Sequence, residues 1–294
     1  MRISQQQLVT SSLEHVRVRL DALAKAQSVA STGRTVQKPS DDPGKAGGIL
    51  GLRAAQKARE QEAKNADNAS TWVSLADAKL QQASQAIQRV RDLAVRASST
   101  LQPSEREAIA VEMNGLRDEI LGIANSQNEG QGLFAGTVGG AAIAQVAGSW
   151  MYVGNQGQVT RRVADNETVA VNQTGDQVFG FTAGDNTFQM IDDIVGLVRS
   201  GDATAVGSSI TRVDAALQRV LGGAAQVGAV GARIERVTDR NATEQTAIKT
   251  ELSDLEDADM VDALSELKLQ ETGYQATLTA MARVLQPSLA DFLH

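Results

Sequence analysis

The chain has 294 residues, a formal net charge of −7 and no cysteine. The length allows two domains, the negative charge argues against a general binder of nucleic acid or anionic membranes, and the lack of cysteine excludes disulfides, zinc–thiolate sites and cysteine nucleophiles. Aromatic residues make up only 3% of the chain. Buried area must therefore come from Ala, Leu, Val and Ile, which suits helix–helix contacts better than one large core.

The first residues, MRISQQQLVTSSLEHV, contain no apolar stretch of the kind that a Sec-type signal peptide needs. No run in the chain approaches the roughly 18 consecutive apolar residues of a membrane-spanning helix. We therefore expect a soluble protein that is not inserted in a membrane and carries no standard targeting signal.

Residues 1–40 are predicted to begin with a long helix. Its apolar residues recur in alternating steps of four and three, which is the spacing of a coiled-coil seam. The pattern stops at Ser31-Thr32-Gly33. The strongest seam positions are Val9, Leu13, Val16, Leu20 and Leu23.

The stretch KPSDDPGKAGG, residues 38–48, interrupts the helical pattern with a Gly-Lys step. A phosphate-binding loop needs a glycine five residues before that step and a hydroxyl after the lysine. Here Pro39 stands at the first position and Ala46 at the second, and no strand precedes the stretch. The sequence therefore excludes this kind of nucleotide site.

The acidic pair in the same stretch does not have the spacing of a calcium loop, because proline follows at once and the next acid is Glu60. Asp and Pro beside glycine are typical of turns and helix starts. We predict that Ser40, Asp41 or Asp42 caps a helix whose first turn holds Pro43. The predicted structural corner consists of Pro39, Asp41, Asp42 and Pro43.

Residues 41–130 read as two further helices. One seam runs from Trp72 to Ala97 and ends before Pro103, since proline cannot continue a helix. Ser104 and Glu107 have the spacing of a capping box, which predicts the start of the next helix. That helix is expected to end in the polar run from residue 125 to 132.

Residues 131–186 change pattern. The stretches SWMYVGNQGQVTRRV and ETVAVNQTGDQVFGF contain short alternating runs separated by glycine turns, one of them at Asn155-Gln156-Gly157. This pattern is typical of a small antiparallel β-domain.

Helical periodicity returns in residues 187–255, with a break at Gly201-Asp202. Glycines at 222, 223, 228 and 231 weaken this segment, since each costs about 1 kcal/mol relative to alanine. Residues 256–294 form the last predicted helix, which Pro287 should kink or end. Its seam consists of Leu264, Leu267, Tyr274, Leu278, Met281, Leu285 and Phe292.

We predict a mainly α fold with inserted β. The long N- and C-terminal helices pack side by side as a coiled-coil rod, residues 41–130 and 187–255 form its two halves, and residues 131–186 form the inserted β-domain. Because the terminal seams are rich in small residues, residues 1–40 and 256–294 are expected to be disordered in the monomer and to order on assembly.

Charge is distributed unevenly. Seven acids and no base lie between Glu251 and Glu266, whereas residues 53–64 carry four bases and two acids. These stretches could face each other, or both could be solvated helix surfaces.

The residues offer little for catalysis or cofactor binding. The two histidines are His15, off the first seam, and His294, the last residue. There is no Gly-x-Ser-x-Gly motif, and Trp72 and Trp150 are most simply core residues. We expect no enzyme and no cofactor.

Several stretches resemble the flagellin-like axial proteins of bacteria. They are ASTGRTVQKPSDDP, the region NADNASTWVSLADAKLQQ, the junction ANSQNEGQGLFAGT and the C-terminal LSDLEDADMVDALSELKLQETGYQATLTAMARVLQPSLADFLH. The resemblance covers residues 1–140 and 230–294. The KPSDDP corner and the ending SLADFL are similar to the branch of the family that joins the flagellar hook to the filament, whereas filament flagellins tend to have DDAAG and a short LL ending.

The resemblance implies a protein that is exported unfolded by the flagellar type III apparatus, guided by a dedicated chaperone, and that is located outside the cell at the hook–filament junction. Its implied partners are hook-associated protein 1, flagellin and further copies of itself, with the terminal seams as the assembly interface. Three alternatives stay open: a filament flagellin, a cytosolic coiled-coil scaffold and, least favoured, an enzyme.

Overall fold

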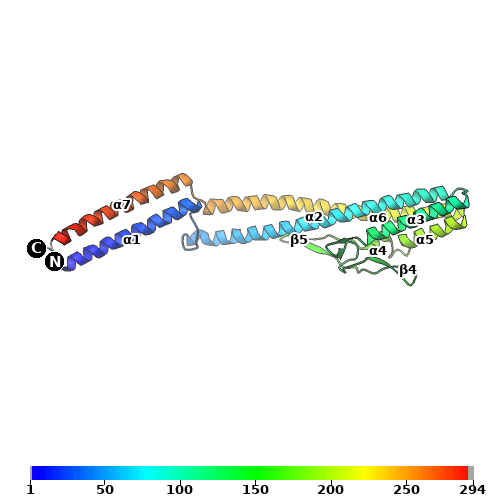
Figure 1. The fold of residues 1–294 in the computed structure, drawn as a ribbon, viewed down its shortest axis with the longest axis horizontal. Coiled ribbons are helices and arrows are strands. Elements are labelled where there is room, and N and C mark those ends of the chain that lie inside the picture. The colour runs from blue at the N-terminus through cyan, green and yellow to red at the C-terminus, as the bar shows by residue number, and fades with distance from the viewer. Residues whose placement is uncertain (1, 291–294) are drawn as a thin grey trace. The chain divides into compact units, whose positions relative to one another are not determined.

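The structure, a computed structural model, describes residues 2–290. The chain forms two compact units, of which unit 1 comprises Met1–Ala58 and Gln245–His294 and unit 2 comprises Arg59–Glu244. The predicted class, mainly helical with a small antiparallel strand region in the middle, is confirmed (Figure 1). The elements are α1 (Arg2–Thr32), α2 (Pro43–Ala97), α3 (Pro103–Ala124), β1 (Gln127–Asn128), β2 (Gln131–Gly132), β3 (Ile143–Val146), β4 (Ser149–Tyr152), β5 (Thr160–Ala164), β6 (Glu167–Ala170), α4 (Gly175–Phe179), α5 (Thr187–Ser200), α6 (Ala203–Glu256) and α7 (Met260–Ala290).

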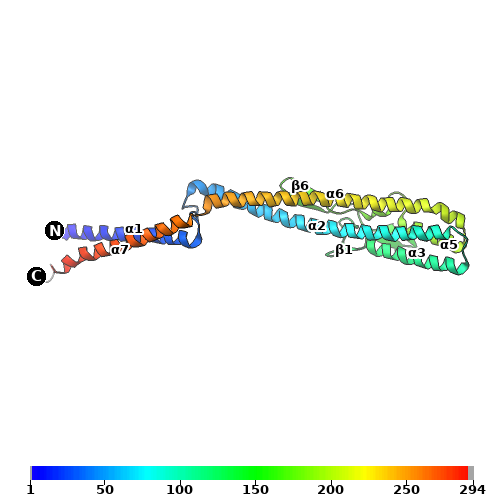
Figure 2. The same cartoon turned by 90° about the horizontal axis from the view of Figure 1, so that it is seen from above.

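Unit 1 contains an antiparallel pair of helices. Figures 1 and 2 show α1 and α7 side by side along their length, with their free ends together. Helix α1 ends where Gly33 takes a φ of 70°, a left-handed conformation that glycine adopts without strain. Of the two predictions for Pro287, that of a helix end is wrong, because α7 continues through this residue to Ala290.

Unit 2 has one apolar core, to which α2, α3, α5 and α6 all contribute. The seam predicted for α2 lies inside this core, and each of its residues is buried because the three–four spacing keeps them on one face of the helix. Helix α6 meets this face with Val213 and Val220. The buried seam residues of α2 are Trp72, Ala76, Leu80, Ala83, Ile87, Val90, Ala94 and Ala97.

Most of the aromatic residues of unit 2 gather in one cluster. Phe188 of α5 lies at its centre, with ring centroids 5.3 Å from Trp150, 5.8 Å from Phe179 and 6.2 Å from Phe181. Phe134 meets Phe179 edge-on at 5.9 Å. These rings attach the strand region to the helices, because Trp150 belongs to β4 and Phe188 to α5.

The strand region consists of separate hairpins, in which β1 pairs with β2, β3 with β4 and β5 with β6. The predicted turn at Asn155-Gln156-Gly157 therefore does not join paired strands, since β4 and β5 on either side of it have different partners. The last stretch assigned to the β-domain also differs, because Gly175–Phe179 forms the short helix α4.

Helix α3 begins at Pro103, one residue before the predicted capping-box serine. The reciprocal contact lies two residues earlier than expected: the backbone N–H of Gln102 donates to the carboxylate of Glu105 at 2.9 Å. The S-x-x-E pattern at Ser104 and Glu107 was thus the wrong pair. Glu107 instead accepts two hydrogen bonds from Arg199 of α5.

We expect the stability of unit 2 to depend on pH through Tyr152. Burial raises the pKa of this phenol from 10.0 to about 12, and its hydroxyl donates to the carbonyl oxygen of Asn155 at 2.7 Å. Because the unfolded chain ionises first, stability is unaffected below pH 10 and falls as the pH rises from about 10 to about 12. Urea unfolding between pH 8 and 11 should show this fall for the natural protein and for Tyr274→Phe. A fall of the same size in Tyr152→Phe would contradict the assignment.

Candidate assembly surface

The seam residues of α1 separate into two rows. Val16 and Leu23, seven residues apart, are half-buried on the side that packs against α7. Leu13 and Leu20, at the alternate heptad positions beside this row, are 53% and 47% exposed. Val9 is half-buried like Val16, so within this chain three of the five predicted seam residues are partly covered and two are exposed.

Helix α7 divides in the same way. Leu267, Tyr274 and Met281 recur every seven residues and are half-buried. Leu264 and Leu278, which belong to the alternate heptad positions, are 55% and 41% exposed. Each helix therefore uses one row to contact the other and presents a second apolar row on its surface.

We call Leu13, Leu20, Leu264 and Leu278 the open rows. Two further members of the predicted interface cannot be placed: the side chain of Leu285 and residue Phe292 lie outside the part of the chain whose side chains the structure describes.

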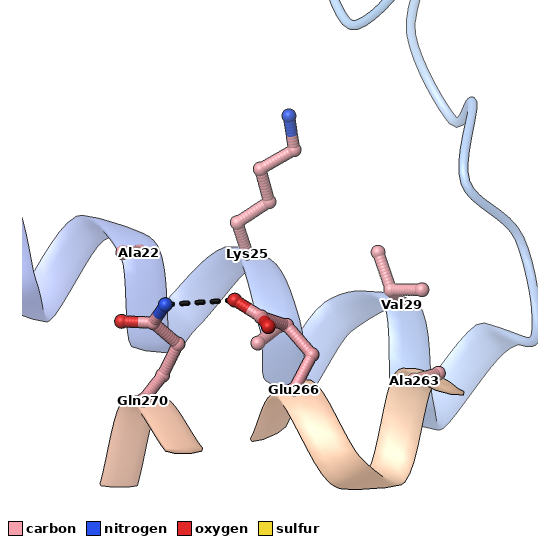
Figure 3. A pocket seen from close by; sticks show the side chains of 7 residues that line it. Ala22, Lys25, Val29, Ala263, Glu266 and Gln270 are labelled. Atoms are coloured by element: carbon pink, nitrogen blue, oxygen red, sulfur yellow. Dashed lines mark hydrogen bonds between the residues drawn. The ribbon is translucent and has the colours of Figure 1, made fainter. Parts of the chain in front are cut away.

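Two small side chains are the most deeply buried in the contact between α1 and α7. Ala26 and Ala263 are the buried residues of this contact, 8% exposed each. Beside them is a hollow of about 270 Å³, also lined by Ala22, Val29 and Gln270, which Figure 3 shows between the two helices. Sequence reasoning missed the two alanines, because it ranked seam positions by size, although their positions follow the same three–four spacing.

The predicted corner consists of two carboxylate caps. The carboxylate of Asp41 accepts hydrogen bonds from the backbone N–H groups of Gln37 and Lys38 at 3.0 and 2.8 Å. These bonds, that of Lys38 first, lower the pKa of Asp41. Asp42 accepts from the backbone N–H groups of residues 44 and 45, at the start of α2. Each acid thus uses one carboxylate oxygen to accept two backbone N–H groups, as in a turn and a helix start.

Pro39 and Pro43 lie in the same turn and helix start as these two acids. Pro39 is exposed in the turn between the helices, and Pro43 is the first residue of α2, a position where its missing N–H costs no helical hydrogen bond.

Glu256 contacts the chain on both sides of this corner, residues 34–35 before it and Arg53 after it. Its side chain is only 2% exposed and forms ion pairs with Arg53 at 2.8 Å and Arg34 at 3.5 Å. Its backbone oxygen accepts from the N–H of Thr35 at 2.7 Å, and the N–H of Ala258 donates to the oxygen of Gly33 at 2.8 Å. We call this set of contacts the Glu256 clamp.

The sequence suggested that the basic residues 53–64 could face the acidic residues 251–266. The ion pair between Arg53 and Glu256 is one such contact. The special position of Glu256 among seven acids was not predictable, because nothing in the spacing distinguishes it. Glu256 differs from the other acids in being buried, and this burial depends on how residues 33–36 lie against the end of α6.

Glu256→Gln should loosen the clamp, because it removes the charge that Arg34 and Arg53 share. Both arginines are about half exposed and can be resolvated, so we expect a loss of about 2 kcal/mol rather than the larger cost of a fully buried pair. The measurement is amide hydrogen exchange at Thr35 and Ala258, which should become faster. Asp254→Asn, an exposed acid on the same helix, is the control, and equal protection in both variants would contradict the clamp.

The described residues offer no evident reaction centre. Among residues 2–290, no three His, Asp or Glu side chains are placed to hold a metal ion. None of the described helices combines the length and apolar character needed to cross a membrane. His15 is exposed on α1, and Trp72 is buried in the core of unit 2.

The terminal helices thus pair with each other and keep exposed rows of leucine at heptad positions. Comparison with known proteins identifies the family. The bacterial flagellin N-terminal helical region matches residues 3–138, and the bacterial flagellin C-terminal helical region matches residues 210–293. The chain belongs to the flagellin family, whose members are structural proteins of the bacterial flagellum.

Relatives match over nearly the whole chain. The flagellar hook-associated protein 3 of Salmonella typhimurium is 27% identical over 94% of this chain and 95% of its own length. That of Escherichia coli is also 27% identical, over 95% and 96%. The flagellin of Bacillus subtilis is 24% identical over 97% of both chains.

Solved structures share the fold. A putative flagellar hook-associated protein from Vibrio parahaemolyticus superposes with a TM-score of 0.70 at 24% identity, covering 74% of this chain and all of that one. FlgL from Xanthomonas campestris gives 0.62 at 20% identity, covering 69% and 99%.

Proposed function

We propose that this protein joins the flagellar hook to the filament, as a structural component without catalytic activity. The proposal is supported by similarity to hook-associated protein 3 of two bacteria along almost the entire chain. The KPSDDP corner favours this role over that of a filament flagellin.

The observation that carries the proposal is the pair of open rows on α1 and α7. Leu13, Leu20, Leu264 and Leu278 are each at least 41% exposed, yet they keep the heptad spacing of a helical contact. Leucines at these positions favour a protein whose terminal helices complete their packing in contact with neighbouring chains. A head-to-tail contact of this kind builds open filaments or rings.

The partners we propose are hook-associated protein 1 on one side, flagellin on the other, and further copies of this chain around the junction. We propose that the protein is secreted through the flagellar type III apparatus with the help of an export chaperone and functions outside the cell. Among the described side chains of α1 and α7, Ala26 and Ala263 are the buried ones, which favours ordering of these helices on assembly rather than before it.

Deletion of the gene in its flagellated host tests the proposal. We expect cells with hooks but without filaments in electron micrographs, and flagellin released into the medium. Normal filaments would refute the junction role.

The second candidate is a filament flagellin, favoured by the similarity to the Bacillus subtilis protein. Copy number separates the two roles, because a junction protein is scarce in sheared flagella whereas a flagellin is their main component. Quantitative mass spectrometry of sheared flagella, with the hook protein as reference, makes that comparison.

A further inference from the structure

The two chain segments of unit 1 carry opposite charge. Residues 1–58 contain nine bases and four acids, and residues 245–294 contain three bases and nine acids. Among the side chains that the structure describes, the ion pairs between the segments all end on one carboxylate, that of Glu256. Most of the opposite charge in unit 1 is thus left uncompensated within the chain.

Lys25 is an example of a base in unit 1 that does not pair with a nearby acid. It lies on α1 beside the hollow that α7 lines with Glu266 and Gln270, but Figure 3 shows its side chain directed away from both. The carboxylate of Glu266 accepts a hydrogen bond from the amide of Gln270 at 2.7 Å instead. A base and an acid on neighbouring helices therefore do not pair.

On its other side, Lys25 lines a second hollow of about 270 Å³ together with Lys38 and Asp41. Two ammonium groups and one carboxylate leave this site with one unbalanced positive charge. One carboxylate oxygen of Asp41, Oδ2, already accepts hydrogen bonds from two backbone N–H groups. The hollow is therefore suited to one additional carboxylate, and we call it the basic hollow.

Suitable carboxylates lie on the opposite segment. Glu251 and Asp254 are three residues apart on α6, which places them on one face of the helix. Both are exposed, and among the described residues neither side chain has a hydrogen-bond or ion-pair partner. We call this pair the acidic face.

We propose that the acidic face of one copy of this chain binds the basic hollow of the next copy. The inference rests on the proposed function, because it requires copies to assemble side by side. Two different surfaces of one chain then form a heterologous contact, which repeats from copy to copy. Opposite charges on those surfaces set the direction and register of the contact more than its strength.

Charge reversal tests the proposal in the flagellated host. Lys25→Glu with Lys38→Glu, and Glu251→Lys with Asp254→Lys, should each lower the number of filaments per cell about tenfold, since like charges then face each other. All four substitutions in one chain restore the attraction and should restore the filaments. The matched control is Glu235→Lys with Asp239→Lys, two exposed acids four residues apart on α6 in unit 2, which should assemble normally.

The outcomes separate this inference from the junction role. If the gene deletion abolishes filaments while the double variants assemble normally, or if the fourfold variant assembles no better than the doubles, the charge contact is wrong and the junction role stands. If the deletion itself leaves normal filaments, the junction role fails. Immunoblots of the medium show whether each variant is exported. If a charge-reversed variant is not exported, the cysteine cross-link described next tests the contact in its place.

The absence of cysteine from the natural chain permits a direct test. Lys25→Cys combined with Glu251→Cys, oxidised in isolated flagella, should give disulfide-linked multiples of the 31.0 kDa chain on non-reducing gels. Neither single cysteine should do so. A monomer band alone, or a cross-link to a protein of another mass, would overturn the proposal, the latter by placing a different partner on this surface.

Discussion

Leu278→Asp is expected to yield a protein that is exported but does not assemble. Leu278 is 41% exposed on α7, so within one chain the aspartate stays in water and leaves folding intact. In the assembled state the same position would be covered by another chain. Burying an unpaired carboxylate there costs several kcal/mol, and we expect a non-motile strain with few or no filaments.

The measurement combines soft-agar swimming, electron microscopy and an immunoblot of the medium. Thr279→Asp is the matched control, because Thr279 is exposed one residue further along the helix and outside the heptad positions. Normal swimming of the Leu278→Asp strain would show that the open rows are not an assembly interface. Loss of the protein from the medium would instead point to export or folding.

Phe188→Ala should have the largest effect on the stability of unit 2. The side chain is fully buried and lies between Trp150, Phe179 and Phe181, so its removal loses apolar burial and leaves a cavity. Substitutions of this kind cost about 3–5 kcal/mol. Because the ring joins the strand region to α5, the hairpin of β3 and β4 should loosen together with the helices.

Urea unfolding followed by circular dichroism measures this loss. Val146→Ala, in the same hairpin but 46% exposed, should change the free energy of unfolding by no more than about 0.5 kcal/mol. Similar values for the two variants would mean that the aromatic cluster does not hold the strand region to the helices.

The helices were largely predictable from the sequence. The seam from Trp72 to Ala97 is strict in spacing, and burial on one face follows from the helical period. The ends of α1 and α5 were also evident, because Gly33 and Gly201 take the left-handed conformation that ends a helix.

Strand pairing was less predictable. Alternating residues identify a strand but not its partner, so β4 and β5 were expected to share a turn although each pairs elsewhere. Helix α4 escaped notice because five residues are too few for periodicity to show.

The candidate surface was predicted only as a set of positions. Heptad spacing singles out Leu13 and Val16 alike, but it does not say which one the second helix of the chain covers. That choice depends on the rotation of α1 against α7, in which Ala26 and Ala263 are the buried positions. The Glu256 clamp was missed for a related reason, since burial of one acid among many is a property of the packed corner.

The placement of the aromatic residues gives each unit its own optical signal. Both tryptophans of the chain, Trp72 and Trp150, belong to unit 2, whereas the aromatic residues of unit 1 are Tyr274 and Phe292. Tryptophan fluorescence therefore follows the folding of unit 2 alone, while ordering of α1 and α7 passes unseen at those wavelengths. A tryptophan introduced at Leu20 or Leu264 would thus report assembly of the terminal helices, once Trp72 and Trp150 are replaced by phenylalanine to give a dark background.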